Sequence, residues 1–114
     1  MRRLPDTPLV TVQKFAEAVN RHDLDALTVL VAANCVVAAF NGGTETVGAP
    51  AMQAQFAALF EERPKARLGV SGRMSQGDVV AQHETISRGL SVIERRIALY
   101  TVLHEKIVRV DVIR

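Results

Sequence analysis

The spacing of apolar residues changes near residue 65, from a helical repeat to the two-residue alternation of strands. Up to Arg63, apolar side chains recur every three or four residues, as they do along one side of an amphipathic helix. From Ala66 to the end, apolar and polar side chains alternate, which is typical of half-buried strands. The order predicts helices first and then a contiguous, mostly antiparallel sheet.

Turn and capping residues divide the first part into separate elements. Thr7 and Asp23 have the side chains that cap helix N-termini, and Asn20-Arg21-His22-Asp23 interrupts the apolar repeat at a sharp corner. The run from Asn34 to Phe40 contains two valines and is better explained as a short strand. We therefore predict helices from Pro8 to the corner at residues 20–23, over residues 24–31 and over residues 49–63, with a strand over residues 34–40.

The second part is predicted to contain strands joined by tight turns. Gln76-Gly77-Asp78, Arg88-Gly89 and His104-Glu105-Lys106 separate the alternating runs. The predicted strands cover residues 67–74, 79–87, 94–103 and 108–112.

Length and hydropathy indicate a single domain of ordinary globular type. The chain has 114 residues, enough to bury roughly two thirds of its unfolded surface, and 48% of them are hydrophobic. It has no uninterrupted run of about 18 apolar residues, so we expect no membrane span. The first residues lack the apolar stretch of a secretory signal. We expect one cytoplasmic domain over residues 1–114, with residues 1–7 as a flexible N-terminus.

Charge and cysteine content argue against several kinds of partner. The formal net charge is only +2, and the basic residues are scattered rather than gathered into a patch, so nucleic acid is not an expected partner. The single Cys35 cannot form an internal disulfide and has no adjacent basic residue to activate it. His22 and His104 lie in predicted turns, without metal-ligand spacing. We predict no metal site and no cofactor.

Several local motifs follow one another in a recognisable order. They are residues 15–20 followed by 22–27, Asn41-Gly42-Gly43, Val47-Gly48, residues 77–81 and Tyr100-Thr101-Val102. From about Val10 to Arg114 this order resembles the nuclear transport factor 2-like superfamily, in particular its SnoaL-like and ketosteroid-isomerase-like branch. The resemblance implies a cone-shaped, cystatin-like α+β fold. In that fold three N-terminal helices pack on a curved, mixed but mostly antiparallel sheet, and the interior is commonly a ligand pocket.

The resemblance argues against ketosteroid isomerase chemistry. Those isomerases use a carboxylate base and an oxyanion hole made by a tyrosine and a protonated aspartate. The matching positions here are Ala39 for the base, Phe15 for the tyrosine and Ala98 for the aspartate. Without these groups, neither proton abstraction nor enolate stabilisation is expected.

His83 is the leading candidate for pocket chemistry. The strand over residues 79–87 carries polar side chains on both faces, and the resemblance places Ala81, His83 and Thr85 inward. Histidine exchanges protons near neutral pH, so His83 is predicted to be a catalytic acid or base. The alternative is a histidine that is hydrogen-bonded within the core or at the pocket rim.

On the next strand, Arg96, Ala98 and Tyr100 share one face and are predicted to point inward with Ala98. Tyr100 could donate a hydrogen bond to a ligand carbonyl, or its hydroxyl could simply be satisfied by a neighbour. Arg96 could bind a ligand carboxylate at the pocket mouth, or it could reach solvent.

These placements define a predicted cavity for a small, largely apolar organic ligand. Two hypotheses stay open: a cofactor-independent isomerase, cyclase or hydrolase that uses His83 and Tyr100, or a non-catalytic ligand-binding or dimerisation module. Val80, Ile86, Ile97, Leu99 and Ile113 would form an apolar outer sheet face, which we expect a homodimer to cover. The predicted lining of this cavity is Phe15, Val19, Phe56, Leu59, Val70, Ala81, His83, Ala98, Tyr100, Val108 and Val110. The predicted binding residues are Phe15, Val19, Phe56, Leu59, Ala81, Arg96, Ala98 and Val110.

Overall fold

The computed structural model describes residues 4–114, which form three helices and six strands. The predicted flexible N-terminus lies partly outside this range, because residues 1–3 are not described. The elements are α1 (Pro8–Asn20), α2 (Leu24–Val29), β1 (Val31–Ala39), β2 (Thr44–Val47), α3 (Ala49–Glu62), β3 (Ala66–Gln76), β4 (Val79–Arg88), β5 (Ser91–Leu103) and β6 (Lys106–Ile113).

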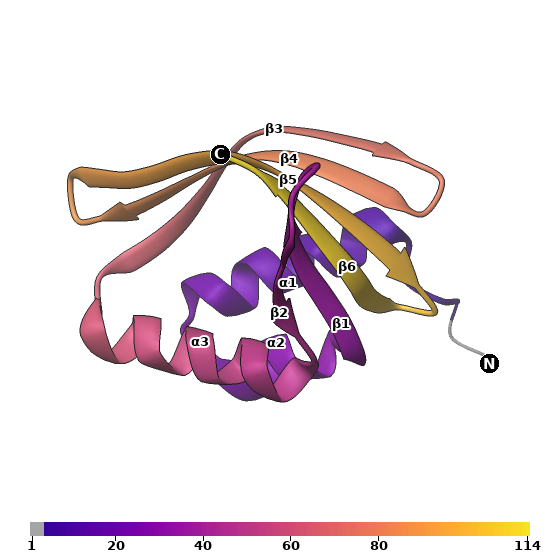
Figure 1. Ribbon diagram of the computed structural model, residues 1–114, viewed down its shortest axis with the longest axis horizontal. Coiled ribbons are helices and arrows are strands. Elements are labelled where there is room, and N and C mark those ends of the chain that lie inside the picture. Colours follow the sequence, from indigo (N-terminus) through magenta and orange to yellow (C-terminus); the bar gives the residue numbers. More distant parts are fainter. Residues whose placement is uncertain (1–3) are drawn as a thin grey trace.

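The strands form one mixed sheet in the order β2-β1-β6-β5-β4-β3. Strands β1 and β6 are parallel, and the other neighbours are antiparallel. Figure 1 shows β3, β4 and β5 arching across the top of the view, with the three helices below them. The predicted α+β class and the mixed, mostly antiparallel sheet are confirmed.

The predicted corner between the first two helices is present, and side chains cap both of them. The Thr7 side chain accepts a hydrogen bond from the Val10 backbone N–H, and Asp23 accepts one from that of Ala26. Between the helices, His22 adopts the left-handed conformation that a tight corner requires, with φ of 55°. None of the helices in residues 4–114 is long and apolar enough to cross a membrane.

The predicted end of the second helix is wrong, and one strand was missed. The second helix ends at Val29, because Val31 opens β1 and pairs with Ile107 of β6. Strand β2 was not predicted at all. It spans four residues, three of them polar, and it pairs with β1 just before Gly48 turns the chain into α3 with φ of 93°. So short a run does not show the alternation that identifies a strand.

The core lies between the helices and the inner face of the sheet. Val12, Phe15 and Val19 of α1 are buried, as the apolar repeat predicts. On the inner face, Val80, Tyr100 and Ile107 are buried. The opposite face has partly open apolar side chains, with Ile97 at 40% exposure and Ile113 at 38%.

Candidate functional site

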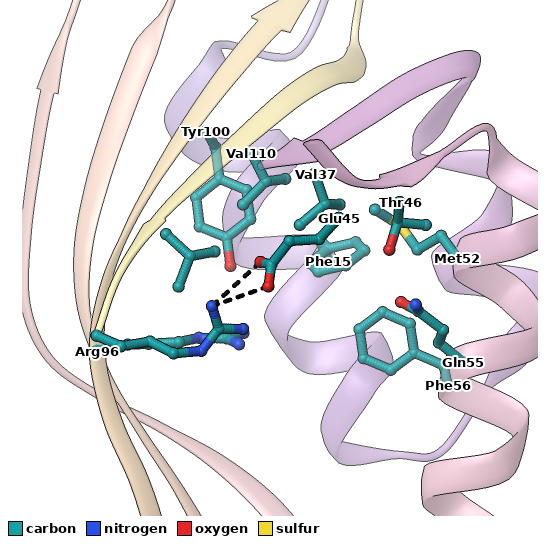
Figure 2. A pocket seen from close by; sticks show the side chains of 12 residues that line it. Phe15, Val37, Glu45, Thr46, Met52, Gln55, Phe56, Arg96, Tyr100 and Val110 are labelled. Atoms are coloured by element: carbon teal, nitrogen blue, oxygen red, sulfur yellow. Dashed lines mark hydrogen bonds and ion pairs between the residues drawn. The ribbon is translucent and has the colours of Figure 1, made fainter. Parts of the chain in front are cut away.

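A hollow of about 180 Å³ opens between α3 and the inner face of the sheet, and we refer to it as the main cavity. Figure 2 shows Met52, Gln55 and Phe56 of α3 on one side of it, and Arg96 and Tyr100 of β5 on the other. Its lining residues are Phe15, Val37, Glu45, Thr46, Met52, Gln55, Phe56, Arg96, Tyr100, Val110, Val112 and Arg114.

A smaller hollow of about 30 Å³, the side cavity, lies beyond one wall of the main cavity. The two hollows share four lining residues, which are Phe15, Phe56, Arg96 and Tyr100. The rest of the side cavity is mostly apolar and is lined by Val19, Leu59, Ala66, Arg67, Leu68 and Ile86.

A fully buried carboxylate, that of Glu84 on β4, lies on the inner face beside these cavities, with 0% exposure. Its Oε2 atom accepts hydrogen bonds from the Tyr100 hydroxyl and from Gln82 Nε2, the latter at 2.7 Å. Its Oε1 atom accepts one from Arg96 Nε at 2.9 Å. Because a buried charge is costly unless it is paired and hydrogen-bonded, these donors are what allow Glu84 to stay inside.

The buried pair continues toward the cavity mouth as a row of alternating charges. Arg96 Nη1 also donates to Glu94 at 3.3 Å, and Arg114 Nε donates to Glu94 at 3.1 Å. Arg114 Nη1 then reaches the two carboxylate oxygens of Glu45 at 3.1 and 3.2 Å, the contact drawn with dashed lines in Figure 2. Each arginine in the row therefore lies between two carboxylates.

Burial and the Glu84 charge shift the proton equilibria of two cavity residues. Burial raises the pKa of Tyr100 well above its usual range, and the nearby carboxylate of Glu84 raises it further. For Arg96, burial alone lowers the pKa, but the attraction of Glu84 outweighs it and the net pKa is raised. Tyr100 is therefore a neutral hydrogen-bond donor and Arg96 a permanent cation.

The predicted inward orientation of His83 and Ala81 is wrong. Gln82 and Glu84 are the buried residues of β4, whereas the His83 side chain is exposed on the outer face. There the His83 Nδ1 atom lies 2.6 Å from Ser71 Oγ, beside the bulge where β3 shifts register. Because alternate side chains of a strand point to opposite faces, Ala81 is also turned away from the cavities.

The orientation of β4 could have been predicted from its apolar residues. Val80 and Ile86 share the even-numbered face with Glu84, and both point inward, contrary to their predicted place on the outer face. The antiparallel register also sets Glu84 opposite Arg96. Polar side chains on both faces of β4 obscured the apolar signal of Val80 and Ile86. The buried face is the one that carries Gln82 and Glu84, although these are the more polar side chains.

Most of the other predicted lining residues do line a cavity. Phe15, Phe56, Arg96, Tyr100 and Val110 line the main cavity, and Val19 and Leu59 line the side cavity. Arg96 does not extend into solvent, since its side chain is only 19% exposed and is paired with Glu84. Val70 and Val108 line neither cavity, and Ala98 points inward but is covered completely. Glu84, Thr46 and Arg114 were not predicted.

The remaining reactive side chains have structural contacts. Burial raises the pKa of Cys35 to about 11, so its thiol is not activated. His22 stacks on Phe60 with ring centroids 4.2 Å apart, and its Nε2 atom lies 2.9 Å from the Ala66 carbonyl oxygen. Within residues 4–114, no three histidine, cysteine, aspartate or glutamate side chains cluster as a metal site.

Comparison with known proteins identifies the family. The model of the SnoaL-like domain matches residues 12–110, which is most of the chain. The chain belongs to the SnoaL-like domain family. This SnoaL-like protein has no match among curated proteins.

Several solved structures have the same fold as this chain. A cystatin-fold protein from Novosphingobium aromaticivorans is 22% identical with a TM-score of 0.87, covering 96% of this chain and 99% of its own. A proposed polyketide cyclase from Sinorhizobium meliloti is 19% identical with a TM-score of 0.75, covering 90% and 93%. A proposed ketosteroid isomerase from Kribbella flavida is 15% identical with a TM-score of 0.77, covering 97% and 81%. At these identities the likeness shows the fold alone.

Proposed function

We propose that this protein binds a small, largely apolar organic molecule in the main cavity, and that Arg96 holds an oxygen atom of that molecule. The volume of about 180 Å³ supports a ligand of single-ring size. An apolar cavity of about 150 Å³ is known to take up benzene, whereas sites for drug-sized ligands begin at about 300 Å³. A compound with several fused rings is therefore not the expected ligand.

The free donor on Arg96 is the observation on which this proposal depends. Arg96 Nε and Nη1 are engaged by Glu84 and Glu94, while Nη2 has no acceptor among residues 4–114. Since Arg96 lines both cavities, Nη2 is a polar group that both cavities offer to a guest. The flanking carboxylates already compensate the arginine charge, which favours a neutral carbonyl or hydroxyl oxygen over an anion.

A catalytic role is the second candidate, and the pairing of Tyr100 with Glu84 supports it. The Tyr100 phenol lines the main cavity and donates a hydrogen bond to a buried carboxylate, while Arg96 beside it could polarise a ligand carbonyl. A cofactor-independent isomerase, cyclase or hydrolase could use these groups. His83 has no place in such a mechanism, because it lies on the other face of the sheet.

The non-catalytic role is the stronger of the two. Both oxygens of Glu84 already accept hydrogen bonds, so Glu84 is not a free base. Phe15 and Ala98, at positions that carry polar groups in the isomerases, are apolar here. Turnover of a compound recovered from the purified protein by mass spectrometry would decide in favour of catalysis.

Blocking the cavity mouth tests the binding proposal. Acetophenone carries one ring and one carbonyl oxygen, and its affinity can be measured by calorimetry. Gln55 lines the cavity from an exposed position on α3, so Gln55→Trp is expected to weaken binding at least tenfold. The matched control is Gln53→Trp, on the same helix but outside the lining, and it should bind like the unmodified protein. Absence of binding, or equal affinity in both variants, would overturn the proposal.

A further inference from the structure

We propose that Phe56 is a removable partition between the two cavities and that it sets the length of ligand the site accepts. The inference rests on the proposed function, since it concerns which ligands fit that site. It is drawn from the four residues that the two cavities share, which together form the dividing wall.

The wall is built around packed aromatic rings. The Phe56 ring meets Phe15 edge to face, with centroids 5.9 Å apart and planes at 77°. Phe15 in turn lies 6.0 Å from the Tyr100 ring. Phe56 therefore forms the α3 side of the wall, where its ring packs against Phe15.

The other wall residues are held more firmly than Phe56. Phe15 and Tyr100 are buried, and Arg96 is tied to Glu84. Phe56 is only partly buried, and Met52 is the buried residue of its helix. Helix α3 also starts at Gly48 without a side-chain cap. A lightly packed, uncapped element is where local motion is easiest, so Phe56 is the wall residue most able to move.

Opening the wall at Phe56 would add apolar space to the main cavity. The side cavity beyond it is lined by Val19, Leu59, Leu68 and Ile86, which suits an alkyl chain. Arg96 lies at the boundary and lines both hollows. A ligand with its ring in the main cavity and its oxygen on Arg96 would therefore direct an alkyl substituent at Phe56.

A series of phenyl ketones measures this length limit directly. Acetophenone, propiophenone, butyrophenone and valerophenone differ by one methylene each, and a buried methylene is worth about fourfold in affinity. For the unmodified protein, we expect affinity to stop rising or to fall as the chain lengthens. For Phe56→Ala, we expect it to keep rising by about fourfold per methylene. Calorimetry gives both profiles.

Phe60→Ala is the matched control. Phe60 lies one turn further along α3 and packs 5.8 Å from Phe56, but it lines neither cavity. Its length profile should match that of the unmodified protein. If Phe56→Ala does not fold, Phe56→Leu replaces it, because leucine preserves more of the packing. Its affinity should then rise with chain length more than in the unmodified protein, but by less than fourfold per methylene.

The outcomes separate the two proposals. If acetophenone binds but every variant shows the same length profile, the partition is wrong and the binding function stands. If none of the proteins binds any ketone, the binding function is wrong and the partition falls with it.

Discussion

At the scale of single residues, the paired Glu84 carboxylate is the least expected feature of the interior. Its burial is consistent with the physics of buried charge only because Tyr100, Gln82 and Arg96 donate to it. Gln82 is itself held by Arg73, whose Nε donates to its side-chain oxygen at 2.6 Å. The inner face of the sheet is thus polar at its centre, although the sequence predicts an apolar one.

Removing the Glu84 charge is expected to destabilise the fold. Glu84→Gln leaves the guanidinium of Arg96 without its buried counter-charge, and loss of one member of a buried pair costs roughly 3–5 kcal/mol. Arg96 keeps Glu94, so we expect the lower end of that range. Glu45→Gln removes an exposed partner of Arg114 and should cost less than about 1 kcal/mol. Urea unfolding measures both, and equal costs would contradict the network described here.

The raised pKa of Tyr100 makes stability depend on pH in the alkaline range. Folding favours the protonated phenol, so this contribution is complete below the unfolded-state pKa of about 10 and is lost as pH rises through the folded-state value. The free energy of unfolding should therefore fall more steeply above pH 10 in the unmodified protein than in Tyr100→Phe. If the free energy of unfolding changed with pH in the same way in both proteins, folding would not raise the pKa of the phenol. Because the chain has one tyrosine, phenolate absorbance follows this residue alone.

At the scale of elements, the sequence predicts most helices and strands because their apolar spacing matches their burial. It predicts β4 as a strand but assigns its faces incorrectly. The pattern of β4 has polar residues on both faces, and the pairing of Glu84 with Arg96 depends on a neighbouring strand. Val80 and Ile86 mark the buried face, but the contact that allows a carboxylate to stay there comes from another strand, and a single alternating run does not contain that information.

Asn20 joins two elements that are distant in the sequence. Its side chain accepts a hydrogen bond from the Leu68 backbone N–H at 2.7 Å and donates one to the Leu68 carbonyl at 2.9 Å. Asn20→Ala removes both bonds between the end of α1 and β3, so we expect a loss of about 1–3 kcal/mol in urea unfolding.

Glu17→Ala, on the exposed side of α1, is the control for Asn20 and should change stability by less than about 0.5 kcal/mol. A cost for Asn20→Ala no larger than that of the control would mean that this connection does not hold the helix to the sheet.

At the scale of the whole molecule, the family and the fold class follow from the order of motifs, while the shape of the interior does not. The main cavity depends on β2 and on Arg114, which supply Glu45, Thr46 and the outer ion pair. Glu45 and Thr46 reach the site through the pairing of β2 with β1, whereas Arg114 directly follows β6. Cavity residues on the long predicted elements were therefore predicted more often than those on short or terminal segments.

We propose that a second copy of the chain covers the outer sheet face. Ile97 and Ile113 lie opposite each other there with their side chains partly exposed. Arg109 and Asp111 form an ion pair on the same strand. In a dimer with two-fold symmetry, Arg109 of one copy could pair with Asp111 of the other. Ile97→Lys should then yield a monomer in analytical ultracentrifugation.

Leu90→Lys is the control for this interface. Leu90 is an exposed apolar residue at the β4–β5 turn rather than on the sheet face. Its substitution should leave the dimer intact. A monomeric unmodified protein, or equal dissociation of both variants, would contradict the proposed interface.

We propose that the inner face of the sheet, with Arg96 and Tyr100, receives a small ligand, while His83 faces away from it. The most direct test is to titrate isotope-labelled protein with acetophenone and to monitor the backbone amide chemical shifts by NMR. We predict shifts at Val37, Thr46, Arg96 and Tyr100, and none at Ser71 or His83. Shifts centred on Ser71 and His83, or no shifts at saturating ketone, would contradict it.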